Sequence, residues 1–126
     1  MEYQDYGDCK VTRKHGEFHS YDDKPAVVFH NGELHWYEYG KRHRDDGPAI
    51  THPSGYQVWY CNGKYHRDDG SAVIHYDGGQ EWYRHGVIHR DDGPATIHNG
   101  FAQWWINGVK IKEGGCISKV KSARNF

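Results

Sequence analysis

The sequence has few of the residues that stabilise small secreted proteins or anchor membrane proteins. Its 126 residues contain only three cysteines, none of them in a CxxC pair, which argues against a disulfide framework and against a thiolate zinc site. No apolar stretch approaches the roughly 20 residues of a membrane-spanning helix. The first residues are acidic and polar, whereas a secretory signal begins with basic and then apolar residues. We therefore expect a cytoplasmic protein with free thiols and no membrane partner.

The chain also lacks an excess of either charge. Sixteen Lys and Arg residues stand against 17 Asp and Glu, for a net charge of −1. Proteins that bind nucleic acid without sequence preference rely on a positive field, so general nucleic-acid binding is not expected. Aromatic residues make up 15% of the chain, far more than disordered segments contain. The length suits one domain or one short repeat array.

An internal repeat dominates the sequence. Four acidic pairs recur every 23 residues without a gap: Asp22-Asp23, Asp45-Asp46, Asp68-Asp69 and Asp91-Asp92. Around them the unit consists of Asp-Asp-Gly-Pro-Ala, an apolar stretch, a Gly-centred turn, Trp-Tyr, a second Gly-centred turn and His-Arg. Turns of this composition reverse a chain between strands, so each unit is predicted to be a β-hairpin.

The repeat predicts the architecture of the whole chain. Single hairpins of this size are not stable, so the units must stack side by side. We predict an all-β fold, an elongated single-sheet array of about four and a half 23-residue hairpin repeats in one domain. Residues 1–20 form a degenerate N-terminal cap, residues 21–112 four repeats, and residues 113–126 a basic tail or a closing strand.

Two columns of aromatic residues run through the repeats. Trp36, Trp59, Trp82 and Trp104 share one register, and the next register holds Tyr37, Tyr60, Tyr83 and Trp105. Adjacent residues of a strand point to opposite faces, so the columns lie on opposite sides of the sheet. The Trp column is expected to supply the core and the second column to remain exposed. Because Tyr, Trp and Arg often anchor interfaces, the predicted binding residues are that second column with three arginines at its margin, Arg44, Arg67 and Arg90.

The unit resembles a known repeat family. Residues 59–70 read Trp-Tyr-Cys-Asn-Gly-Lys-Tyr-His-Arg-Asp-Asp-Gly, which is similar to the MORN-variant repeat pattern Trp-Tyr-x-Asn-Gly-Lys-x-His-Arg-x-Asp-Gly-Pro-Ala. The resemblance covers residues 16–112. Such repeats are common in bacteriophage and giant-virus proteins, and the resemblance implies a small accessory protein that interferes with a host system. After the second turn the chain has His-Arg-Asp-Asp where the ordinary MORN unit has His-Gly-x-Gly, and paired carboxylates repel anionic head groups, which disfavours a lipid-binding role.

The most chemical pattern is a His-Arg-Asp-Asp box, present as residues 43–46, 66–69 and 89–92. Histidine with carboxylates can bind a metal or act as an acid or base. A box that recurs in every unit is better explained by what every unit needs, a stabilised turn, so we expect no metal site and no catalytic residue here. His52, His75 and His98 also share a register, and they are expected to be residues of a solvated surface. Metal binding by these histidines is not expected, because the ligands of one ion lie within about 2 Å of it and neighbouring repeats usually stand further apart.

These observations favour a non-enzymatic binding protein that uses no cofactor. Its expected partner is a host protein or protein complex, captured through the repeated aromatic face, as in a phage-encoded inhibitor of host defence acting in the host cytoplasm. The alternative is a small-ligand sponge that binds nucleotide signals between repeats. A third interpretation is an enzyme that uses the His and Asp residues of the boxes.

Overall fold

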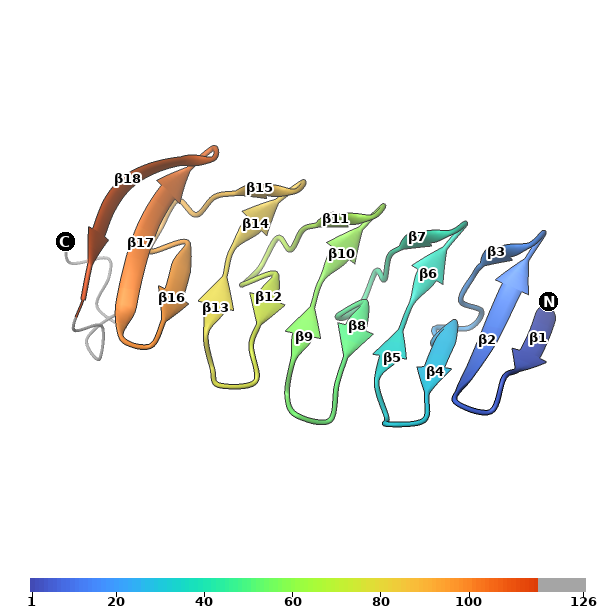
Figure 1. The fold of residues 1–126 in the computed structure, drawn as a ribbon. Helices are drawn as coiled ribbons and strands as arrows, with labels where there is room; N and C mark the ends of the chain where they lie inside the picture. The colour runs from blue at the N-terminus through green and yellow to red at the C-terminus, as the bar shows by residue number, and fades with distance from the viewer. Residues whose placement is uncertain (116–126) are drawn as a thin grey trace.

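The protein folds as a row of antiparallel hairpins, as a computed structural model shows (Figure 1). The structure describes residues 1–115. Its strands are β1 (Glu2–Asp5), β2 (Cys9–Lys14), β3 (Glu17–Phe18), β4 (Val27–Phe29), β5 (Leu34–His35), β6 (Tyr37–Glu38), β7 (Lys41–Arg42), β8 (Ile50–Thr51), β9 (Gln57–Val58), β10 (Tyr60–Cys61), β11 (Lys64–Tyr65), β12 (Val73–Ile74), β13 (Gln80–Glu81), β14 (Tyr83–Arg84), β15 (Val87–Ile88), β16 (Thr96–His98), β17 (Phe101–Ile106) and β18 (Val109–Gly114). Residues 1–115 contain no helix. The predicted all-β, single-sheet array is therefore confirmed.

Each unit contributes two hairpins, which turn at the two opposite long edges of the array (Figure 1). The first pairs β4 with β5, β8 with β9, β12 with β13 or β16 with β17, and these strands, together with β1, β2, β3 and β18, form a 12-stranded sheet. The second hairpins, β6–β7, β10–β11 and β14–β15, form separate two-stranded sheets. In Figure 1 the first hairpins turn along the lower edge of the array and the second along the upper edge.

The tryptophan of each unit marks the point where the chain passes from one hairpin to the other. The backbone N–H of Trp59 donates to the carbonyl of Ala72 in the next unit at 2.7 Å. The Trp59 carbonyl accepts a hydrogen bond from the backbone N–H of His66 in its own unit at 3.1 Å. Trp36 and Trp82 make the same two kinds of bond. One continuous strand thus belongs to both sheets, and its backbone hydrogen-bond partner changes at the tryptophan residue.

The turns have the backbone conformation that their residues predict. In the second turn of the central unit, Asn62 (φ 50°) and Gly63 (φ 83°) both adopt the left-handed conformation of a two-residue hairpin turn. The fourth unit is one residue shorter than the others at its first turn. There Asn99 (φ 46°) and Gly100 (φ 79°) make the same tight turn, so the deletion shortens a loop and leaves the sheet intact.

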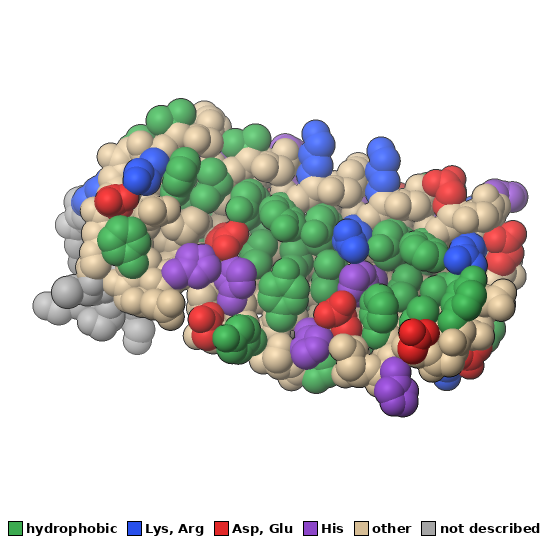
Figure 2. Space-filling view, in the orientation of Figure 1, with side chains coloured by type: hydrophobic (Ala, Val, Ile, Leu, Met, Phe, Trp, Pro, Cys, Tyr) green, Lys and Arg blue, Asp and Glu red, His purple; other side chains and the backbone are tan. Residues whose placement is uncertain are grey.

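The aliphatic core lies in the middle of the array and is small. Ile50, Val58 and Val73 are buried against one another, with Tyr60 and Tyr83 among the partly buried rings that pack on them. Figure 2 shows hydrophobic side chains gathered in a band over the strands on the face drawn. Because the array is a single layer of hairpins (Figure 1), the aromatic rings themselves must complete the burial of these aliphatic residues.

The N-terminal cap and the C-terminal segment extend the predicted repeats. The cap contains three strands: β2 pairs with β1 along four residues and with β3 along two. β2 takes the place of a Trp-bearing strand, with Thr12 and Arg13 in the Trp-Tyr positions. At the other end β18 pairs with β17 and closes the described sheet. The predicted tail beyond residue 115, including Cys116, lies outside the described residues; Cys9 and Cys61 are free thiols.

Candidate functional site

The tyrosine column belongs to a continuous row of rings that crosses the units. Tyr60 lies between Arg42, whose guanidinium carbon is 5.7 Å from the ring centroid, and Tyr65, whose ring centroid is 5.1 Å away. Tyr65 in turn contacts Tyr83 at 4.9 Å. Arg42 also lies 5.6 Å from the ring of Tyr37, which extends the row toward the cap.

This row is packed into the protein, so the expectation of an exposed tyrosine column is wrong. Tyr60 and Tyr83 are partly buried on the aliphatic core. Burial and the neighbouring Tyr65 raise the pKa of Tyr60 to about 12. Burial and the hydrogen bond to Glu81 raise the pKa of Tyr83 still further. The tyrosines are covered because the aliphatic core residues lie on their face of the sheet and not on the face of the tryptophans.

The arginines of the boxes lie on the tryptophans of the opposite column. The guanidinium carbon of Arg67 is 3.8 Å from the ring centroid of Trp59, and Arg44 and Arg90 lie over Trp36 and Trp82 at 3.8 and 4.0 Å. Cation–π contacts of this kind are favourable by about 0.5–2 kcal/mol. The tryptophans are thus covered partly by arginine: Trp36 is buried, and Trp59, Trp82 and Trp104 are partly buried.

Each of these arginines is also held by polar partners. The Nε atom of Arg67 donates to Asp69 at 3.0 Å and one of its terminal nitrogens donates to the carbonyl of Ser71 at 3.1 Å. Arg90 repeats this arrangement with Asp92 and the carbonyl of Pro94. Arg44 differs, because it donates two hydrogen bonds to Asp23 of the preceding unit, and this contact lowers the pKa of Asp23. The arginines therefore have a structural role, as the turn interpretation of the boxes predicts.

The histidine of each box connects its unit to the next. Nδ1 of His66 accepts a hydrogen bond of 2.8 Å from the N–H of His85 in the following turn, and Nε2 of His66 lies 2.9 Å from Asp68. The same backbone bond joins three other pairs, His19 with Tyr39, His43 with Asn62, and His89 with Asn107. Because Nδ1 accepts from an N–H, the imidazole proton lies on Nε2, facing the aspartate.

Grooves lie between neighbouring boxes and bring together part of the predicted set. A groove of about 700 Å³ between the first and second boxes is lined by Tyr60 with Arg44 and Arg67. The next groove, of about 430 Å³, is lined by Tyr83 with Arg67 and Arg90. Tyr37 and Trp105 line neither groove; the Trp105 indole N–H instead donates to Gln103 at 3.2 Å.

The rims of the grooves are acidic. The first groove holds four aspartates and two arginines. The aspartate side chains project into solvent, 79% exposed at Asp45 and 88% at Asp68, whereas Arg44 and Arg67 are only 20% and 26% exposed. A ligand that approaches the groove therefore meets carboxylates before it meets guanidinium groups.

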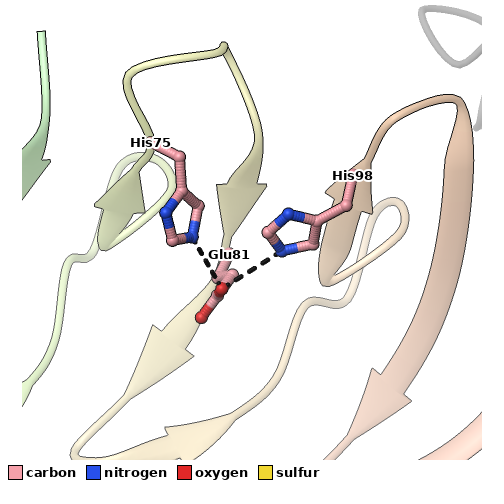
Figure 3. Close-up of side chains that lie close together, drawn as sticks. All are labelled: His75, Glu81 and His98. Atoms are coloured by element: carbon pink, nitrogen blue, oxygen red, sulfur yellow. Dashed lines mark hydrogen bonds and ion pairs between the residues drawn. The ribbon is translucent and has the colours of Figure 1, made fainter.

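A second arrangement, not expected from the sequence, joins two histidines and a glutamate (Figure 3). Nε2 of His75 and Nε2 of His98 lie 2.8 and 3.1 Å from the same carboxylate oxygen of Glu81. The fold overturns the assumption that neighbouring repeats are too far apart for such contacts, since the two imidazole centroids are 4.9 Å apart. The sequence signal for this arrangement is that His75 and His98 occupy the same position in successive repeats. The placement of the Glu81 carboxylate between them depends on the register of the strands.

Comparison of the chain with models of known families, with curated proteins and with solved structures gave no significant match. Within residues 1–115, no segment forms a helix with the length and hydropathy of a membrane span.

Proposed function

We propose that this is a non-enzymatic binding protein whose row of inter-repeat grooves captures an extended, basic segment of a partner protein. The observation that carries the proposal is the repeated acidic rim. Two successive grooves have the same construction, with Arg67 and the pair Asp68-Asp69 shared between them. A linear partner can make equivalent contacts in both.

The charge distribution supports a basic partner over an anionic one. The guanidinium groups already lie on indole rings and donate to carboxylates and carbonyls, so few of their donors remain for a phosphate. The exposed aspartates repel phosphate groups and attract lysine and arginine side chains. The grooves have the volume of small-molecule sites, but their rims disfavour the nucleotide alternative.

The distribution of the boxes supports a binding role over a catalytic one. Their histidines and arginines bond the backbone of adjacent turns, which are contacts that every unit needs. A catalytic centre requires a single constellation of groups, whereas the boxes repeat the same contacts in successive units.

The resemblance to MORN-variant repeats supports the wider part of the proposal. Arrays of this type are typical of phage and giant-virus proteins. On that basis the partner is a host protein or protein complex, the encounter takes place in the host cytoplasm, and its outcome is interference with host defence.

A charge-reversal pair tests the proposal. Asp46 lines the first groove, and because Arg44 pairs with Asp23, Asp46 lies outside the pairing that its counterparts Asp69 and Asp92 make with arginine. Immobilised wild type, Asp46→Lys and the control Asp8→Lys are exposed to a bacterial lysate, and the retained proteins are quantified by mass spectrometry. Asp8 is exposed in the cap and lines neither groove.

Asp46→Lys should retain at least tenfold less of a wild-type partner, about 1.4 kcal/mol, whereas Asp8→Lys retains the wild-type amount. The loss should shrink as salt is raised, because the attraction is electrostatic. Equal retention by all three proteins, or a nucleotide that raises the wild-type melting temperature and elutes the partner, would contradict the groove as a basic-peptide site.

A further inference from the structure

His75, Glu81 and His98 come from two neighbouring units and meet on the sheet. His75 follows β12, Glu81 ends β13, and His98 ends β16 (Figure 3). The register places Glu81 opposite Thr96, two residues before His98, so the two side chains lie on the same face. All three ligand atoms lie within 4.8 Å of one another.

The cluster is not a feature that every repeat needs. The position directly before the Trp is occupied by His35, Val58, Glu81 and Gln103 in the four units, so only the third unit supplies a carboxylate there. His52, in the register of His75 one unit earlier, contacts Ser54 of its own turn. The His-Arg-Asp-Asp boxes recur because they make contacts that every unit needs. The cluster of His75, Glu81 and His98 does not recur in this way and requires another explanation.

Gly79 makes room for one of the imidazoles. A Cβ at this position would lie 2.8 Å from Nδ1 of His98, too close for a side chain to coexist with the ring. The backbone of Gly79 is not in the left-handed conformation, so its torsion angles do not call for glycine. Other units have Glu33 and Tyr56 here. The lack of a side chain at Gly79 therefore leaves the space that the His98 ring occupies.

The carboxylate is held and ionised. Tyr83 donates its hydroxyl to the other Glu81 oxygen at 2.9 Å, which leaves the first oxygen for the histidines. Burial opposes ionisation of Glu81, but hydrogen bonds from His75, Tyr83 and His98 together lower its pKa. Metal-binding carboxylates are commonly oriented by such a hydrogen bond from a neighbouring residue.

We propose that His75, Glu81 and His98 form a binding site for a divalent transition metal, with Zn²⁺ as the best-suited ion. Imidazole and carboxylate ligands suit zinc, which binds them at about 2.0–2.2 Å. Ligands of a tetrahedral site with such bonds stand roughly 3.3 Å apart, so the observed separations of 2.8 and 3.1 Å need to open by only a few tenths of an ångström. The fourth position is left for water or for a side chain of a bound molecule.

The site would connect the third unit to the fourth through a metal ion. His75 and His98 are each partly exposed, with 31% and 43% of their side chains accessible, so an ion can enter from solvent. Both Nε2 atoms become ligands when the imidazole proton moves to Nδ1.

Calorimetric titration of the chelator-treated full chain with ZnCl₂ tests the site. Wild type should show one tight site, which Glu81→Gln and His98→Gln weaken at least tenfold while the matched control His52→Gln does not. Tyr83→Phe, which keeps the ring and removes the hydroxyl, should weaken the site by about tenfold, in the range for an orienting partner of a metal ligand. MgCl₂ should give no tight binding, since Mg²⁺ prefers oxygen ligands.

Nitrogen-detected NMR of the histidines of the wild-type protein provides a readout that does not depend on variants folding. One equivalent of Zn²⁺ should shift Nε2 of His75 and His98 and leave His52 unchanged. The proposal is overturned if Glu81→Gln and His98→Gln bind Zn²⁺ like wild type, if His52→Gln weakens binding as much as they do, or if the His75 and His98 signals do not respond.

Discussion

Replacement of His66 by leucine should weaken the array at its centre. The imidazole accepts the N–H of His85 at 2.8 Å, its ring stacks on that of His85 with centroids 4.1 Å apart, and its side chain is only 11% exposed. Leucine fills a similar volume but accepts no hydrogen bond. One neutral hydrogen bond contributes a net ~0.5–1.5 kcal/mol and a ring contact somewhat less, so His66→Leu should lower the free energy of unfolding by about 1–2 kcal/mol.

The measurement is urea unfolding followed by circular dichroism, with thermal unfolding beside it. At this chain length each kcal/mol corresponds to a melting-temperature decrease of about 3–6 °C. The control is His52→Leu, because Nδ1 of His52 accepts only from Ser54 in its own exposed turn, where water can replace it. That variant should remain within about 0.5 kcal/mol of wild type.

Position along the array adds a second comparison. His19 makes the same type of bond, to the N–H of Tyr39, but at the junction between the cap and the first unit. In a linear array each unit is stabilised by its neighbours, so loss of a central junction separates two halves and loss of a terminal one frees only the cap. His19→Leu should therefore be less destabilising than His66→Leu. If His66→Leu and His52→Leu unfold at the same urea concentration, the inter-repeat bond does not have the stabilising role assigned to it.

Three further predictions concern the aromatic rows and the glutamate. Trp59→Ala should destabilise the fold by about 3 kcal/mol or more, since it removes a partly buried indole and the surface on which Arg67 lies; a melting temperature within a degree or two of wild type would show that the indole is dispensable. In an alkaline spectrophotometric titration, Tyr60 should ionise only near its pKa of about 12, whereas the unfolded phenol ionises near 10. The contribution of the neutral Tyr60 to stability is therefore fully present below about pH 10 and is lost as the pH rises toward 12, and Tyr60→Phe should reduce that loss. The pKa of Glu81 is lowered in the folded protein, so its effect on stability has the opposite pH dependence. The stabilisation is present above the ordinary Glu pKa of about 4.3 and is lost as the pH falls through the lower pKa of the folded state. The difference in unfolding free energy between wild type and Glu81→Gln should therefore decrease in acid, and a difference independent of pH would refute the assignment.

The sequence predicted the hairpins because turn chemistry is local. Asn62 and Gly63 determine their turn through their own torsional preferences, and the regular spacing of such turns determines the order of strands. The pairing of units followed from the need of each hairpin to share its sheet with a neighbour.

The assignment of faces could not be derived from the sequence in the same way. Alternation places Trp59 and Tyr60 on opposite sides and Val58 on the side of Tyr60, because Val58 and Tyr60 are two residues apart on one strand. The other two core residues, Ile50 and Val73, come from neighbouring strands, and their position beside Val58 depends on the register of strand pairing. The stacking of Arg67 on Trp59 depends on how the second hairpin folds back across the sheet. Contacts such as these join residues that no local rule relates.

The contact of Glu81 with His98 shows the same limit more sharply. A spacing of 23 residues places His75 and His98 in equivalent positions, yet their separation depends on the tilt and register of β13 and β16. Once the register is known, the convergence follows directly from the antiparallel pairing.

The bonds between units have a consequence for how such a chain changes over generations. The N–H of Gly63 donates to the carbonyl of Arg42, and the N–H of Gly86 donates to that of Tyr65, so each junction repeats the previous one. Duplication of one whole 23-residue segment would create a new junction of the same kind and disturb none of the others. The array would then gain one groove, and a partner long enough to occupy it would make one more contact. This contact would form within a complex that already exists, at a high effective concentration. For the partner proposed above, the number of copies of the segment that the gene carries would then set the number of contacts, and with it the affinity.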